Sequence, residues 1–228
     1  MNSIWGSRPA GRMFFRVMLA LVLAFPFFPL RAAGPQEAGV PSGSRVLVVY
    51  FSVPETDDPH GMTQEEENST VVIDGKVLGN TQYVAQLIRD MTGGDLFRIE
   101  PVRPYPLDHR TLVAQARKER DERARPAIAG DIAGLERYDT VFIGYPTWWY
   151  DLPMIMYSFL ERYDLSGKTV IPFNTHGGSR FAGTVDTISR LQPGARVSEN
   201  GLSISRDDVE RAETDVREWL TEWGYRKK

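Results

Sequence analysis

Hydrophobic residues alternate between two patterns from Arg45 onward. Short apolar runs bounded by polar or turn residues are typical of buried strands. The expected strands are 46–51, 96–102, 140–145, 168–174 and a weaker one at 195–202. Helix-like stretches, most with apolar residues three and four positions apart, separate them. The expected helices are 81–91, 107–123, 153–163, 183–191 and 207–223. This alternation predicts an α/β fold, in which a parallel sheet carries helices on both faces.

An acidic, turn-rich stretch at residues 53–78 interrupts this alternation between the first strand and its helix. Within it, residues 70–77 (TVVIDGKV) contain Asp74-Gly75, a pair that favours the tight turn of a β-hairpin. We interpret the stretch as a surface insertion with a small hairpin. His60 lies among its acidic residues, but such a charge run is more typical of a solvated loop than of a metal site.

The first 33 residues differ in composition from the rest. Arg8, Arg12 and Arg16 precede an apolar run at 17–30, and small residues follow it, which is the order of a secretory signal peptide. The run of about 14 residues is shorter than the roughly 20 of a membrane-spanning helix. We expect a signal peptide at 1–33, a linker at 34–44 and one domain at 45–228, in a periplasmic or otherwise exported protein. The alternative is an uncleaved N-terminal membrane anchor.

Charge and cysteine content exclude several classes of protein. Removal of residues 1–33 takes four of the 27 basic residues, so the remaining chain has 23 basic and 30 acidic residues, a net charge of about −7. This balance argues against nucleic-acid binding. The chain has no cysteine, which excludes disulfides, thiolate nucleophiles, cysteine zinc sites and Fe–S clusters.

Two segments at strand ends carry groups suited to a nucleotide ligand. Ser52 follows the first strand, and Gly79-Asn80-Thr81 opens the next helix. Small hydroxyl and amide side chains beside free helix-start N–H groups can hold a phosphate, although Asn80 is equally consistent with an ordinary helix cap. Neither a Walker lysine nor G-x-G-x-x-G is present. The second segment, Asn174 to Ser179 (NTHGGS), has two glycines that let backbone N–H groups approach a ligand, or that form a flexible turn.

A third segment, Pro146 to Tyr150 (PTWWY), places aromatic rings just past the end of a strand. Exposed rings need either a core or a flat ligand to cover them. Because open α/β sheets bind ligands beyond the carboxyl ends of their strands, we expect the three segments to meet there. A planar cofactor is the ligand that this combination indicates.

In this order the three segments resemble the flavodoxin family, in particular a bacterial flavodoxin-like group with a P-x-W-W loop. The resemblance covers residues 45–223 and implies a three-layer sandwich, a five-stranded parallel sheet in the order 2-1-3-4-5, and FMN as cofactor. It implies phosphate contacts for Ser52, Asn80 and Thr81. It implies ring contacts for Pro146, Thr147, Trp148, Trp149 and Tyr150, and contacts with the flavin edge for Asn174, Thr175, Gly177, Gly178 and Ser179. No residue is assigned to catalysis or to a metal.

One departure bears on this resemblance. About 26 residues separate Ser52 from Gly79, so the phosphate site forms only if the insertion loops out and returns. Three functions stay open: an exported electron carrier with an acidic face near the ring, an FMN-dependent NAD(P)H quinone or nitro reductase, and a binding module without flavin. The expected partners are flavin and a redox protein or small electron acceptor, with neither nucleic acid nor stable membrane insertion after signal cleavage. His176 either serves the flavin as a hydrogen-bond or proton donor or faces solvent.

Overall fold

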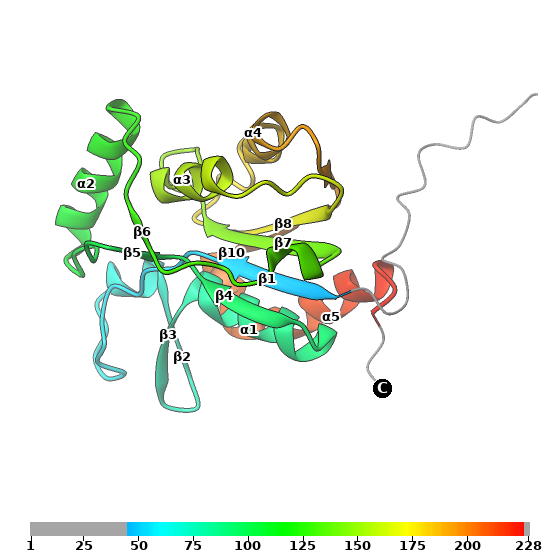
Figure 1. The fold of residues 1–228 in the computed structure, drawn as a ribbon. Coiled ribbons are helices and arrows are strands. Elements are labelled where there is room, and N and C mark those ends of the chain that lie inside the picture. Colours follow the sequence, from blue (N-terminus) through cyan, green and yellow to red (C-terminus); the bar gives the residue numbers. More distant parts are fainter. Residues whose placement is uncertain (1–44, 226–228) are drawn as a thin grey trace, which may run out of the picture. The chain divides into compact units, whose positions relative to one another are not determined.

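Parallel strands form the centre of the fold in the computed structural model, which describes residues 45–225 (Figure 1). The five main strands are β1 (Val46–Tyr50), β4 (Asp95–Arg98), β7 (Thr140–Pro146), β8 (Thr169–His176) and β10 (Leu202–Ser205). Their order is β4-β1-β7-β8-β10, and each neighbouring pair is parallel. Counted along the chain, this is the expected order 2-1-3-4-5. A sixth, two-residue strand, β9 (Arg196–Val197), also pairs with β8.

Helices cover both faces of this sheet, as Figure 1 shows. On one face lie α1 (Asn80–Thr92) and α5 (Ala212–Glu222), and on the other lie α3 (Met154–Arg162) and α4 (Thr184–Leu191). Strand β1 supplies both cores, because successive side chains point to opposite faces. Leu47 and Val49 pack in the core under α3, whereas Val46 and Val48 pack in the core with α1 and α5. The three-layer expectation is confirmed.

A further helix, α2 (His109–Asp121), stands beyond the end of the sheet at which the strands finish (Figure 1). Asp108 caps it, since the Asp108 carboxylate accepts a hydrogen bond from the Thr111 N–H at 2.9 Å. Leu112 is buried in the core, while the charged residues of the helix face outward. The expected helix at 107–123 is confirmed, and its position leaves one of its sides facing the carboxyl edge of the sheet.

Three predicted elements are wrong in extent. The strand expected at 96–102 ends at Arg98, and the chain then forms the two-residue β5 (Glu100–Pro101), which pairs with β6 (Ile128–Ala129) outside the main sheet. The strand expected at 195–202 is divided between β9 and β10 by the polar turn Ser198 to Gly201. The last helix, expected at 207–223, begins as the 3-10 helix η3 (Arg206–Arg211), which Ser205 caps by accepting a hydrogen bond from the Asp207 N–H.

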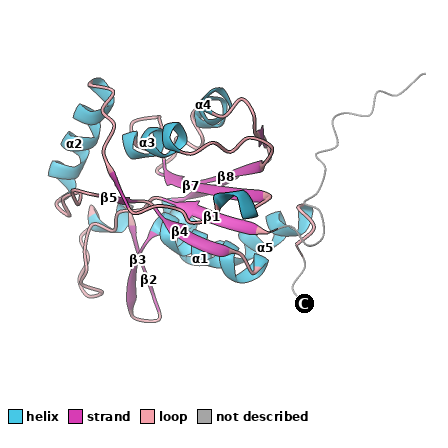
Figure 2. Cartoon of the chain, in the orientation of Figure 1, coloured by secondary structure: helices cyan, strands magenta, loops and turns pink. Residues whose placement is uncertain are grey.

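The insertion forms the hairpin that its sequence predicts. Strands β2 (Thr70–Ile73) and β3 (Lys76–Gly79) are antiparallel and form a separate two-stranded sheet, which projects from the main sheet in Figure 2. Asp74 and Gly75 have φ values of 50° and 74°, the left-handed pair that a tight hairpin turn requires. A 3-10 turn, η1 (Glu66–Asn68), precedes the hairpin, and η2 (Leu135–Arg137) precedes β7. Strand β3 runs directly into α1.

The expected signal peptide at 1–33 and the linker at 34–44 lie outside the described residues. Within residues 45–225, no helix combines the length and apolar character needed to cross a membrane.

Candidate functional site

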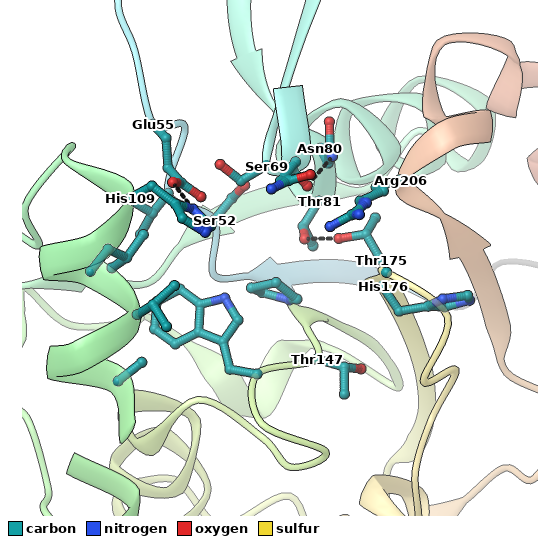
Figure 3. A pocket seen from close by; sticks show the side chains of 18 of the residues that line it. Ser52, Glu55, Ser69, Asn80, Thr81, His109, Thr147, Thr175, His176 and Arg206 are labelled. Atoms are coloured by element: carbon teal, nitrogen blue, oxygen red, sulfur yellow. Dashed lines mark hydrogen bonds and ion pairs between the residues drawn. The ribbon is translucent and has the colours of Figure 1, made fainter. Parts of the chain in front are cut away.

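A pocket of about 210 Å³ opens at the carboxyl edge of the sheet. Its walls come from six parts of the chain: the segment after β1, the end of the insertion, the start of α1, one side of α2, the loop after β7 and the end of β8 (Figure 3). Arg206, at the start of η3, completes the wall. The pocket therefore lies where parallel α/β sheets bind ligands.

The two ends of the insertion meet at this pocket. A Cβ atom placed on Gly79 would lie 2.1 Å from Ser52 Oγ, so glycine permits this approach without displacing the Ser52 side chain. The Asn80 N–H donates to the Ser69 carbonyl at 2.8 Å, and the Asn80 side chain donates to the Asn68 carbonyl at 3.1 Å. These contacts bring the chain back beside Ser52 after the insertion. The insertion thus loops out and returns, as a phosphate site shared by Ser52 and the start of α1 requires.

Polar groups surround the start of α1. Ser52, Asn80 and Thr81 are all at least 96% buried. Thr81 Oγ1 and Thr175 Oγ1 form a hydrogen bond of 2.8 Å, which joins the start of α1 to the end of β8. Ser69 Oγ is buried without a hydrogen-bond partner among the described residues. Hydroxyl groups beside the first N–H groups of a helix suit an anionic ligand.

The loop after β7 holds two aromatic residues in a left-handed backbone conformation. Trp148 and Asp151 exchange backbone hydrogen bonds of 3.0 and 2.9 Å, and Trp149 and Tyr150 between them have φ values of 51° and 61°. Such a turn normally contains asparagine and glycine. Bulky residues at positive φ are uncommon and tend to occur at functional sites, because the strain must be held by the surroundings.

The two tryptophans have different surroundings. Trp148 packs edge-on against Phe51 and Tyr105, with ring centroids 5.4 and 5.5 Å apart, and so belongs partly to the core. Trp149 is 38% exposed and donates through Nε1 to the Val113 carbonyl of α2 at 3.3 Å. The guanidinium groups of Arg117 and Arg120 each lie 5.4 Å from the Trp149 ring. Trp149 therefore presents an aromatic surface at the pocket rim beside a basic helix.

A model of the flavodoxin family matches residues 70–223, more than half of the chain. The chain belongs to the flavodoxin family.

Solved flavodoxin-like structures cover nearly the same region. A protein from Bacteroides eggerthii DSM 20697, provisionally assigned as a flavoprotein, is 29% identical with a TM-score of 0.60, and the match covers 80% of this chain and 99% of that chain. A similarly assigned protein from Bacteroides uniformis ATCC 8492 is 28% identical with a TM-score of 0.56, over 74% and 97% of the two chains. A flavoprotein from Lactobacillus acidophilus NCFM, solved in complex with FMN, is 18% identical with a TM-score of 0.50, over 74% and 97%. The sequence matches no curated protein.

The pocket of this flavodoxin contains most of the residues that the sequence singles out. Those that line it are Ser52, Asn80, Thr81, Pro146, Thr147, Trp148, Trp149, Thr175 and Gly177. Tyr150, Asn174, Gly178 and Ser179 do not line it. Tyr150 is 74% exposed. Asn174 is buried, and its amide donates to Thr147 Oγ1 at 2.6 Å and to the Arg180 carbonyl at 2.8 Å. Asn174 thus ties together the two loops that form the wall.

Three titratable residues of the pocket do not stand out in the sequence: Glu55, His109 and Arg206. The Glu55 carboxylate is buried and lies 2.6 Å from His109 Nδ1. The Glu55 N–H donates to Thr70 Oγ1 at 2.9 Å, which fixes this segment to the hairpin. No local sequence pattern pairs residue 55 with residue 109, because the contact depends on how the insertion folds against α2.

The expected acidic face is not found at this pocket. Among the described residues that line it, Glu55 is the single acidic one, and its carboxylate pairs with His109. Arg206 and His176 also line the pocket, and Arg117 and Arg120 flank Trp149. Arg117 and Arg120 both form ion pairs with Asp121, and Arg206 with Asp207, so cations and acids are both present around the site.

His176 lies at the end of β8, and its side chain is held in the neutral form. Burial, together with the nearby charge of Arg180, lowers the pKa of the imidazole below its ordinary value of 6.5, and the Asp207 carboxylate opposes this shift. The Gly178 N–H donates to His176 Nδ1 at 2.8 Å, which requires that nitrogen to be unprotonated. In Figure 3 the ring points away from the hydroxyl groups at the start of α1.

We predict that His176 destabilises the protein as the solution becomes acidic. Because its pKa is lower in the folded than in the unfolded chain, its contribution to stability is complete above the unfolded value of about 6.5 and is lost as the pH falls through the folded value. The free energy of unfolding in urea, measured at several pH values, should fall less steeply for His176→Gln than for the unchanged protein. An NMR titration of His176 that gives an unshifted or raised pKa would contradict this.

Proposed function

We propose that the pocket binds FMN, the cofactor of the flavodoxin family, and that the protein is an exported electron carrier. The approach of Gly79 to Ser52 carries this proposal, because it brings the Ser52 hydroxyl beside the start of α1 despite the insertion. The L. acidophilus neighbour with the same fold was solved with FMN.

The residues of the pocket fit the two ends of this cofactor. Hydroxyl groups of Ser52 and Thr81 lie at the start of α1, where a phosphate would accept hydrogen bonds. Trp148 and Trp149 offer aromatic surface for the ring, while Asn174 holds the opposing loop in place. Bound FMN supplies one- and two-electron transfer, and the chain supplies binding, orientation and electrostatics.

The exposed aromatic rim supports transfer to another protein. Trp149 and Tyr150 are among the few large hydrophobic side chains that are well exposed in the described part of the chain. Arg117 and Arg120 lie beside Trp149, and both form ion pairs with Asp121. Two arginines with one carboxylate leave this rim positive, which favours a partner with an acidic docking surface, through an association that weakens as salt is added.

A reductase is the second candidate, and the Glu55–His109 pair favours it. His109 lines the pocket, and its Nδ1 forms a hydrogen bond with the Glu55 carboxylate. Its Nε2 is therefore the nitrogen available to a ligand. A carboxylate that orients a histidine in this way is common where protons are transferred. Together with the apolar Leu112 and Val113 of α2, this wall suits an aromatic substrate such as a quinone.

The direct test is an absorption spectrum of the purified chain before and after incubation with FMN and removal of the excess. We expect visible flavin bands that stay with the protein. A protein that remains colourless would refute the redox proposal and leave a binding module. Subsequent bleaching of the bound flavin by NADH or NADPH alone would favour the reductase over the carrier.

Replacement of Trp149 by alanine should weaken FMN binding by about 1–3 kcal/mol if the indole contacts the ring. The matched control is Tyr150→Ala in the same turn, because Tyr150 does not line the pocket. That change should alter the binding free energy by less than about 0.5 kcal/mol. The dissociation constants are measured by titration, with flavin fluorescence as the signal. Equal losses for the two variants, or none for Trp149→Ala, would argue against this contact.

Export is a separate part of the proposal and rests on residues 1–33, which lie outside the described structure. Production of the full chain in a bacterial host, followed by the intact mass of the protein from each compartment, tests it. Cleavage near Ala32 or Ala33 in the periplasmic fraction is the expected result. Retention of the full mass in the membrane fraction would indicate an N-terminal anchor instead.

A further inference from the structure

Arg206 is a cation in the pocket without a close partner. It follows β10 and begins η3, and its side chain reaches toward Thr81 and Thr175 (Figure 3). The Arg206 guanidinium donates no hydrogen bond to any described residue, and its ion pair joins Nε to Asp207 Oδ1 at 3.8 Å. The side chain is 39% exposed. A guanidinium that is more than half buried ordinarily needs an acceptor.

The chain leaves space for this guanidinium. A Cβ atom on Gly177 would lie 3.0 Å from Arg206 Nη1, closer than ordinary packing allows. Gly177 thus permits the arginine to lie beside the end of β8. The hydroxyl groups of Thr81 and Thr175, whose hydrogen bond joins β8 to α1, lie at the same end of this strand.

Several groups near Arg206 can donate hydrogen bonds to an anion. Ser69 Oγ, contributed by the insertion, is buried and unpaired among the described residues. The start of α1 adds its N–H groups and the positive end of the helix dipole. The acidic residue of the pocket, Glu55, is paired with His109 and lies on the opposite side of Ser52 in Figure 3. An anion with several acceptor oxygens satisfies this set.

We propose that Arg206 binds the phosphate of the flavin nucleotide and makes the pocket selective for FMN over riboflavin. Ser69 supplies an additional hydroxyl donor to the same phosphate. This inference rests on the proposed function, which requires that a flavin binds. It adds a charged residue and a residue of the insertion to the phosphate site, whose other expected contacts are neutral side chains.

The test compares the dissociation constants of FMN and riboflavin for the unchanged protein and for Arg206→Gln. Loss of a charge-assisted contact should weaken FMN binding about 10- to 100-fold. Riboflavin lacks the phosphate, so its affinity should change less than about twofold. The dependence of FMN affinity on salt should also become weaker in the variant, because one ion pair is lost.

A matched control comes from the same 3-10 helix. Arg211 is paired with Asp208 at 2.8 Å, and its side chain is 78% exposed. Arg211→Gln removes the same charge from the chain and should leave both affinities unchanged. Arg206→Lys keeps the charge without the planar fork and should lie between the unchanged protein and Arg206→Gln.

The outcomes separate this inference from the proposed function. If Arg206→Gln binds FMN as tightly as the unchanged protein, or loses FMN and riboflavin affinity equally, the phosphate role is wrong while flavin binding stands. If the unchanged protein binds neither flavin, both the proposed function and this inference fail. Circular dichroism of Arg206→Gln identifies a loss of fold. In that case Arg206→Lys tests the phosphate role: an intermediate FMN affinity with unchanged riboflavin affinity supports it, and any other result contradicts it.

Discussion

The site depends on one steric constraint, the absence of a side chain at Gly79. A Cβ atom there would lie 2.1 Å from Ser52 Oγ and 3.1 Å from Ser52 Cβ, so any other residue would displace the Ser52 side chain. That contact joins two points that the insertion separates along the chain. The hairpin leaves the main sheet and leads back into α1, so an insertion of this length is compatible with the family's fold.

The insertion also contributes to the pocket it interrupts. Glu55 comes from its start and Ser69 from the segment before its hairpin; both line the cavity, and Thr70 fixes the Glu55 backbone. Through Glu55 the insertion contacts His109, which fixes α2 to the wall of the pocket. The insertion is therefore part of the wall of the site, and changes within it are expected to alter the ligands that the pocket accepts.

Periodic features could be predicted from the sequence, and long-range pairs could not. The apolar run of β1 and the Asp74-Gly75 turn have local causes, so their structures follow from nearby residues. The position of Arg206 depends on the end of β10 lying next to β8, and the Glu55–His109 pair depends on the path of the insertion. Tyr150, for which the resemblance implies a ring contact, is exposed and does not line the pocket, because it lies in a left-handed turn that its sequence does not suggest.

The charge balance of the site differs from that of the whole chain. The net charge of the sequence is −3, yet the one acidic residue among the described pocket residues, Glu55, is paired with His109, and Arg206 adds a cation. At the rim, Arg117 and Arg120 form ion pairs with the same carboxylate, that of Asp121. Because salt screens exposed charges beyond about 10 Å, these nearby groups rather than the acids elsewhere on the chain determine the field at the ligand. The site therefore lacks the excess of acidic groups that would oppose a negative charge on its occupant, although the composition of the chain is acidic.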